Sequence, residues 1–177
     1  LFGSSQYLST FLFSAPQEYL DWLSAPDLLK QPVNRGAMLA ELRQGITLKI
    51  PVNEVKSVLR RFRKREYVRI ALRDMLEYGT LAEITLEISN IADVCLQMAY
   101  EVCNRDLLNR YGRPLYTDVD GQTQECRFTV LGMGKHGGEE LNYSSDIDIM
   151  FLYTSDAIAS LAGARPVARS IASRNGD

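Results

Sequence analysis

Two aspartates stand one residue apart where an apolar run begins, in the segment Ser145-Asp146-Ile147-Asp148-Ile149. On a β-strand, residues i and i+2 point to the same face, roughly 7 Å apart. Carboxylates at the entry of an apolar strand are costly to bury unless a cation or a hydrogen-bond donor meets them. Magnesium suits such a pair, because it binds a few carboxylates together with phosphate oxygens and water. The pattern therefore predicts Asp146 and Asp148 as catalytic residues and as Mg²⁺ ligands.

The residues before this pair could hold a phosphate group. Gly137 and Gly138 have no Cβ, so their backbone N–H groups can approach a phosphate closely at the start of a short helix. Ser144 and Ser145 add two hydroxyl groups. Two magnesium ions about 3.5–4 Å apart can clamp the attacking and leaving oxygens at a phosphorus atom. We therefore predict that these glycines and serines bind nucleotide or phosphate beside the metal.

The glycines also allow a different interpretation, as a dinucleotide-binding turn. The G-x-G-x-x-G pattern is made by Gly132, Gly134 and Gly137. It follows a predicted strand, and Asp156 lies about 20 residues further on, as that fingerprint requires. A helical crossover between parallel strands needs at least about 10–12 residues, whereas residues 138–145 leave room for about one helical turn. The P-loop pattern fails as well, because His136 follows Lys135 where Ser or Thr is required.

The region before this motif is predicted to be helical. Thr80 and Glu83 have the spacing of a capping box, in which each side chain bonds the backbone N–H of the other residue. Apolar residues then recur at spacings of three and four, namely Leu81, Ile84, Ile88, Ile91, Cys95, Met98 and Val102. This stripe predicts a helix about 30 residues long, ended by Gly112 and Pro114. Because such a stripe must be buried against other helices, residues 1–113 are predicted to form an α-helical bundle.

Other signals in this region concern helix ends and charges. Ser14 to Gln17 has the pattern of a second capping box. Asn53 is a candidate N-cap for another helix, and Gly79 is predicted to end that helix. Four arginines at intervals of four form a basic stripe, made of Arg61, Arg65, Arg69 and Arg73. The favoured interpretation is a solvated face that pairs with acids such as Glu66 and Glu77 or with a neighbouring helix. The alternative is a docking surface for a partner protein.

The composition changes near residue 115. Residues 127–131 and 147–153 are predicted strands, and residues 115–124 are read as a linker or turn between the two regions. Residues 154–177 show no convincing strand pattern. We therefore predict an α+β fold in which a helical region, residues 1–113, precedes residues 114–177, the beginning of a mixed-sheet catalytic domain.

The overall composition limits the possible partners and the compartment. The chain has 177 residues, of which 46% are hydrophobic and 24% charged, so a globular domain is expected. The net charge of −2 gives no reason to expect nucleic acid or an anionic membrane as the main partner. Cys95, Cys103 and Cys126 are an odd number at wide spacings, which favours a reducing, cytoplasmic location.

The motif as a whole resembles a known family. The run Gly132-Met-Gly134-Lys-His-Gly137-Gly138 through Ser145-Asp146-Ile-Asp148, followed by Phe151, is similar to the signature of the glutamine synthetase adenylyltransferase/adenylyl-removing enzymes. That family belongs to the DNA-polymerase-beta-type nucleotidyltransferase superfamily. Three other segments share the resemblance, namely residues 1–5, 59–63 and 70–74. The likeness thus extends from residue 1 to about residue 155.

The resemblance implies a reaction and partners. The family carries two nucleotidyltransferase domains, and Asn142 with the pair Ser144-Ser145 is more similar to the N-terminal, adenylyl-removing one. That domain would use phosphate to release AMP from a tyrosine of glutamine synthetase, giving ADP, while the C-terminal domain adenylylates from ATP. Asp146 and Asp148 match the family's Mg²⁺ ligands, and a PII-type signalling protein is an expected partner. No nucleic acid or membrane partner is expected.

Two departures from the family pattern bear on activity. The superfamily uses a third carboxylate on a later strand, but the only later acids are Asp156 and Asp177, neither of which lies in a strand pattern. The chain is therefore expected to hold part of the catalytic domain and to be inactive alone. His136 stands where the family commonly has an apolar residue, and it is predicted to lie in a loop. An alternative function is a non-catalytic protein-interaction module in which the aspartate pair is idle.

Overall fold

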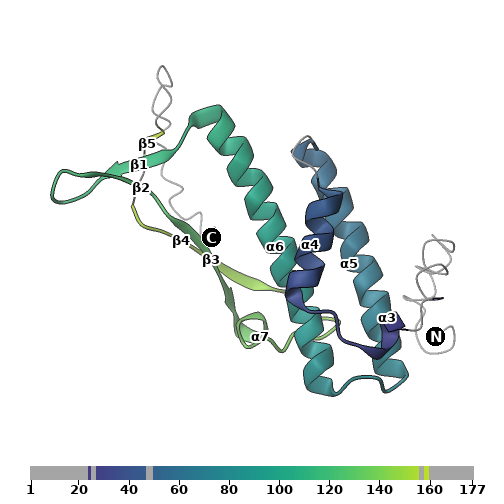
Figure 1. Cartoon of the computed structure of the whole chain (residues 1–177). Coiled ribbons are helices and arrows are strands. Elements are labelled where there is room, and N and C mark those ends of the chain that lie inside the picture. Colours follow the sequence, from purple (N-terminus) through teal and green to yellow (C-terminus); the bar gives the residue numbers. More distant parts are fainter. Residues whose placement is uncertain (1–23, 25–26, 47–49, 156–157, 160–177) are drawn as a thin grey trace, which may run out of the picture. The chain divides into compact units, whose positions relative to one another are not determined.

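The computed structural model describes residues 24, 27–46, 50–155 and 158–159 of the chain. In chain order the elements are α3 (Asp27–Lys30), α4 (Arg35–Gly45), α5 (Val52–Met75), α6 (Leu81–Tyr111), β1 (Pro114–Thr117), β2 (Thr123–Glu125), β3 (Phe128–Met133), α7 (Gly134–Gly137), β4 (Asp148–Tyr153) and β5 (Ile158–Ala159). Helices come first and strands follow, which confirms the predicted α+β class (Figure 1). The capping box predicted at Ser14–Gln17 lies outside the described residues.

The chain divides into two compact units. One contains residues up to 100 together with 132–148, and the other contains residues 101–131 together with those from 149 onward. The aspartate pair, the glycines and the serines of the motif therefore all belong to the first unit. The division into residues 1–113 and 114–177 stays a prediction from the sequence.

In the first unit, α5 and α6 form an antiparallel helical hairpin, with α4 alongside α5 (Figure 1). The capping box at the start of α6 is confirmed: the backbone N–H of Thr80 donates to Glu83 Oε2 at 2.7 Å, and that of Glu83 donates to Thr80 Oγ1 at 3.3 Å. The predicted stripe of α6 is buried at Ile84, Ile88, Ile91, Met98 and Val102. Leu81, at the first turn, is an exception, because 78% of it is exposed.

Two predicted helix boundaries were wrong. Asn53 is not an N-cap: α5 begins at Val52, and Pro51 precedes it with φ −63° and ψ 144°. Proline fixes φ and lacks an N–H group, so it can start a helix without a side-chain cap. At its other end α5 stops at Met75 rather than at Gly79, with Glu77 in the left-handed conformation at φ 57°.

In the second unit, β1 lies between β2 and β5, and both pairings are antiparallel. Leu115 faces Glu125 and Thr117 faces Thr123. The linker or turn predicted at residues 115–124 is confirmed only as a turn, because the residues on either side of it form the strands of a β-hairpin. Its turn is held by Asp118, whose Oδ1 accepts hydrogen bonds from the N–H groups of Asp120 and Gln122. The prediction of no strand after residue 154 was also wrong, since β5 pairs with the free edge of β1.

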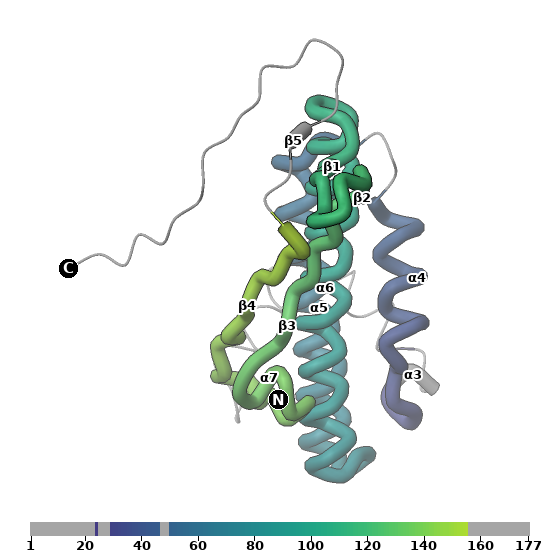
Figure 2. The backbone as a smooth tube through the Cα atoms, turned by 90° about the vertical axis from the view of Figure 1, so that its left-hand side faces the viewer, coloured from purple at the N-terminus to yellow at the C-terminus, as the bar shows by residue number. Residues whose placement is uncertain are grey.

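The predicted strands at 127–131 and 147–153 are confirmed as β3 and β4, which pair with each other (Figure 2). Arg127, just before β3, accepts a hydrogen bond through its carbonyl oxygen from the N–H of Thr154, just after β4. Contact between the start of one strand and the end of the other shows that they run antiparallel. Among the described helices, none is both long and apolar enough to cross a membrane.

Candidate functional site

The two aspartates lie at the point where the chain enters β4. Asp148 is the first residue of the strand, and Asp146 precedes it in the irregular segment. Both are exposed. Within the described part of the chain, neither carboxylate has a hydrogen-bond or ion-pair partner. Their placement on one face of the chain stays a prediction.

The turn that ends β3 brings the glycines beside Asp148. A Cβ added to Gly134, which has φ 52°, would lie 3.7 Å from Asp148 Oδ2. A Cβ on Gly137 would lie only 2.6 Å from the carbonyl oxygen of Gly132. The glycines are thus required for the chain to fold back on itself in the single turn of α7. The N–H of Gly138 donates to the carbonyl oxygen of Gly134 at 3.0 Å, so in this structure it serves the turn.

This geometry excludes the dinucleotide-binding alternative. That fingerprint requires two parallel strands joined by a helical crossover. Here β3 and β4 are antiparallel neighbours, and the helix between them is α7, of four residues.

The serines belong to a turn that leads into the aspartate pair. Both Ser144 Oγ and Ser145 Oγ donate to Asn142 Oδ1, at 3.2 and 2.8 Å. The backbone N–H of Ser144 donates to the same oxygen, and that of Ser145 to the carbonyl oxygen of Asn142. The serine hydroxyl protons thus shape the turn in this structure. A phosphate oxygen accepts hydrogen bonds, so the predicted phosphate-binding role would require these hydroxyl groups to change rotamer and donate to the phosphate instead.

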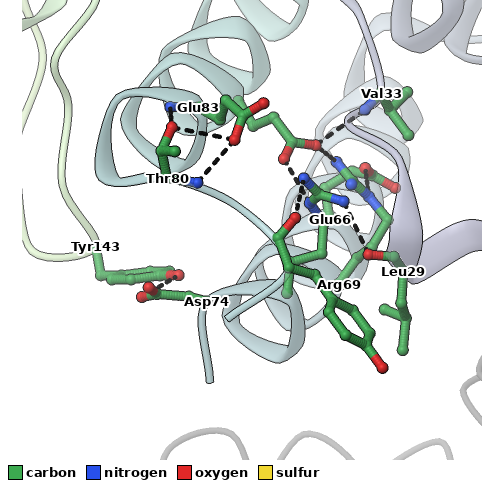
Figure 3. A network of polar contacts seen from close by, with 11 residues as sticks. Leu29, Val33, Glu66, Arg69, Asp74, Thr80, Glu83 and Tyr143 are labelled. Carbon is green, nitrogen blue, oxygen red and sulfur yellow. Dashed lines mark hydrogen bonds and ion pairs between the residues drawn. The ribbon is translucent and has the colours of Figure 1, made fainter. Parts of the chain in front are cut away.

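Three contacts that sequence reasoning missed fasten the motif to the long helices. His136 Nε2 lies 2.9 Å from Asp93 Oδ1, and the backbone N–H of Leu141 donates to Ser89 Oγ at 3.1 Å. Both partners lie on α6. Tyr143 Oη donates to Asp74 Oδ2 on α5 at 3.2 Å, as Figure 3 shows. Burial and the Asp74 carboxylate raise the pKa of Tyr143, so this phenol stays protonated. The spacing of Ser89 and Asp93, one helical turn apart, was the available signal.

His136 is therefore not the loop residue that was predicted. It lies in α7 with 5% of its surface exposed. Asp93, its partner, also forms an ion pair with Arg35 on α4, with 2.9 Å between Arg35 Nη1 and Asp93 Oδ2. The imidazole fits because Gly132 has no side chain: a Cβ there would lie 3.0 Å from His136 Nδ1.

Two arginines of the α5 stripe, Arg69 and Arg73, belong to a buried ionic network, whereas Arg61 is exposed and Arg65 is half-buried. Arg69 and Arg73 are 1% and 0% exposed. Arg69 Nε donates to Glu66 Oε2 at 2.8 Å, which confirms the predicted pairing with Glu66. Glu87 on α6 lies 2.9 Å from Arg73 Nε and 2.5 Å from Arg69 Nη2. Because Arg69 and Arg73 are enclosed between the helices, they cannot form the predicted alternative, a docking surface.

The third carboxylate of the superfamily pattern is absent from the part of the chain that the structure covers. No group of three or more His, Cys, Asp or Glu residues among the described ones could hold a metal ion. Asp156 and Asp177 lie outside these residues. The role of Asp146 and Asp148 as metal ligands stays a prediction.

Comparison with known proteins identifies the family. The family model described as glutamate-ammonia ligase adenylyltransferase matches residues 1–174. The chain belongs to this family. The structure adds that the motif, in which exposed Asp148 lies beside Gly134, is attached to α5 and α6 by the contacts of His136, Leu141 and Tyr143.

Individual relatives agree with the family assignment. A bifunctional glutamine synthetase adenylyltransferase/adenylyl-removing enzyme from Shewanella oneidensis is 38% identical over 151 residues, which are 85% of this chain and 15% of that protein. The protein of the same name from Hahella chejuensis is 30% identical over 174 residues, which are 97% of this chain and 18% of that protein. The chain thus spans less than a fifth of the length of these relatives.

Proposed function

We propose that this chain carries part of the active site for removing AMP from glutamine synthetase, as the adenylyl-removing half of this adenylyltransferase family. The observation that carries the proposal is the position of Asp148. Its exposed carboxylate, without a partner among the described residues, lies beside the glycine turn at Gly134. The carboxylate could bind a cation there, and the exposed backbone beside it leaves room for a phosphate bound to the same cation.

The proposed reaction is phosphorolysis. An oxygen of inorganic phosphate forms a bond to the AMP phosphorus while the bond from that phosphorus to the tyrosine oxygen breaks. The tyrosine leaves as a phenolate and takes a proton from water, and the products are ADP and the unmodified tyrosine.

The donor set fits Mg²⁺. Asp146 and Asp148 are hard oxygen ligands at the surface, and each has coordination capacity left because no described residue donates to it. Magnesium bound there would neutralise phosphate charge and align the attacking and leaving oxygens. The residues of the chain would hold the metal and keep the glycine turn close to the phosphate. A third ligand has to come from outside the described residues.

The exposed faces of β3 and β4 support the expectation that the working domain is larger. Met150, Phe151 and Leu152 are consecutive, so they point to alternate faces of the strand, and all three are at least 45% exposed. Phe128 and Leu131 on β3 are also exposed. A two-stranded ribbon that is apolar on both faces requires further strands or helices to cover it. We therefore propose that the chain alone does not turn over.

The choice of the adenylyl-removing half rests on Asn142 and the Ser144-Ser145 pair, which resemble the N-terminal domain. Glutamine synthetase as the substrate, a PII-type protein as a regulator and a cytoplasmic location are proposals on the same basis. The names of the relatives, which contain both activities, support the substrate.

The test is metal-dependent nucleotide binding. Mn²⁺, which replaces Mg²⁺ and is visible by electron paramagnetic resonance, would be titrated with and without ADP into the chain and its Asp146→Asn and Asp148→Asn variants. The control is Asp120→Asn. It removes one acid from another D-x-D sequence, Asp118-Val119-Asp120, which lies in the β1–β2 turn.

We expect each site variant to weaken Mn²⁺–ADP binding by roughly ten- to hundredfold, the effect of losing one charged ligand. The control should bind as the unchanged chain does. If both site variants bind Mn²⁺–ADP like the unchanged chain, the aspartate pair is idle and the protein-interaction alternative is favoured.

A further inference from the structure

The glycine turn, residues 132–138, contains one buried histidine, His136. Its ring lies close to Gly132, and its Nε2 lies 2.9 Å from Asp93 Oδ1 on α6. Its other ring nitrogen, Nδ1, is buried and has no hydrogen-bond partner among the described residues. Its one polar contact in the described structure is therefore the one to Asp93.

The chemistry of Asp93 fixes the direction of this contact. Asp93 is paired with Arg35 through its other oxygen, so it is a carboxylate that only accepts hydrogen bonds. His136 Nε2 must therefore carry the proton and donate. A charge-assisted hydrogen bond of this kind is stronger than a neutral one, and it links three elements in series, α4, α6 and α7.

We propose that Asp93 is a positioning residue, which acts through His136 to hold the glycine turn beside Asp148. The other two polar contacts of the motif with the long helices involve Leu141 and Tyr143, which follow the turn in sequence. Within α7 itself, a single helical turn, the described polar side-chain contact with α6 is that of His136. Without the Asp93 contact the buried imidazole would lose its partner, and α7 would move to give it access to water. This inference rests on the proposed function in one respect: it takes the glycine turn to be the place where phosphate approaches the metal.

The turn can be monitored directly through hydrogen exchange of three backbone amides. Gly138, Glu139 and Glu140 donate to the carbonyl oxygens of Gly134, His136 and Lys135. The chain has one histidine, so its imidazole signals in nuclear magnetic resonance spectra need no assignment. The variants are Asp93→Ala, which removes the acceptor, and Asp93→Asn, which keeps an acceptor oxygen but loses the charge. The control is Asp106→Ala, which removes another acid of α6 that pairs only with Arg110.

In Asp93→Ala we expect protection of the three turn amides to fall by roughly ten- to hundredfold, the loss of one hydrogen bond to a charged group. The His136 Nε2–H signal should disappear, while the amides of α6 keep their protection. Asp93→Asn should restore most of the protection, and Asp106→Ala should leave the turn unchanged. If Asp93→Ala exposes all amides equally, or leaves the turn amides protected, the inference is wrong. If the alanine variant does not fold, hydrogen exchange of the same three amides is measured in Asp93→Asn instead.

A second measurement separates positioning from general stability. Affinity for Mn²⁺ alone, which depends on the aspartates, should stay within about twofold in Asp93→Ala, whereas affinity for Mn²⁺–ADP should fall about tenfold. Equal loss of both would contradict a role in positioning the turn. The two proposals fail separately: an unchanged chain that does not bind Mn²⁺–ADP refutes the proposed function, and unaltered exchange of the turn amides in Asp93→Ala refutes this inference.

Discussion

Replacing Glu87 by Gln tests whether the ionic network inside the helical hairpin stabilises the fold. Glu87 is 2% exposed, and its two carboxylate oxygens contact Arg69, Arg73 and the backbone N–H of Val33. Glutamine has the same size and shape but no charge. The substitution therefore removes one negative charge from a network in which Glu66 and Glu87 pair with three guanidinium groups, those of Arg65, Arg69 and Arg73.

The expected loss in the free energy of unfolding follows from the partners that each arginine would keep in the variant. Arg69 would keep Glu66, with Nε and Oε2 2.8 Å apart. Among the described residues, Arg73 would keep neutral hydrogen-bond partners, the carbonyl oxygens of Leu29 and Tyr78, and the more distant charge of Glu83. One fully buried cation would thus lose its hydrogen-bonded counter-charge, and breaking a buried ion pair in this way costs about 3–5 kcal/mol.

The assay is urea unfolding followed by circular dichroism at the helical band, which gives the free energy of unfolding. The matched control is Asp106→Asn, because Asp106 also pairs with an arginine on α6 but is about a third exposed. An exposed pair of this kind contributes about 0–1 kcal/mol. The double variant Glu87→Gln with Arg73→Met removes the stranded cation and should recover part of the loss.

The reasoning is refuted if Glu87→Gln lowers the free energy of unfolding no more than the control does. It is also refuted if the double variant is less stable than Glu87→Gln alone, because the loss would then not come from an uncompensated charge on Arg73.

Two further predictions concern the capping box and the glycine turn. Hydrogen bonds from the backbone N–H and then the hydroxyl of Thr80 lower the pKa of Glu83, so its contribution to stability is present above the ordinary pKa of a glutamate and lost as pH falls through the lowered value. The difference in melting temperature between the unchanged chain and Glu83→Gln should therefore shrink between about pH 7 and about pH 3; a constant difference would show that the carboxylate charge is irrelevant. Gly137→Ala should destabilise the chain by about 1–3 kcal/mol in urea unfolding, because its Cβ would lie 2.6 Å from the carbonyl oxygen of Gly132. Gly45→Ala, where nothing lies within 4 Å of the added Cβ, is the control, and equal effects of the two substitutions would disprove the steric explanation.

Sequence patterns predicted the elements that depend on their own residues. The long helix α6 was predicted in type and extent because its capping box and its apolar stripe, which recurs over about six turns, are local signals. The strands β3 and β4 were predicted for the same reason. The resemblance of the motif to the adenylyltransferase family was carried by a few residues at fixed spacing, and the match over residues 1–174 confirms the family.

Contacts between distant segments were not predictable in this way. Arg69 and Arg73 have the spacing of a solvated stripe, and only the presence of Glu87 opposite them allows their burial. His136 likewise has no local signal for burial, because its partner Asp93 comes from another helix, 43 residues earlier. The short strand β5 exists because the edge of β1 is available for pairing, which two residues of sequence cannot indicate.

The sequence by itself determined the helical lead-in, the two strands around the motif and the chemistry of its aspartates and glycines, because side-chain type and spacing act over a few residues. Only the tertiary structure decided which charges are buried and which residues hold the glycine turn against α6. A buried charge is tolerated only where an opposite charge meets it, and the residue that supplies it can lie anywhere in the chain.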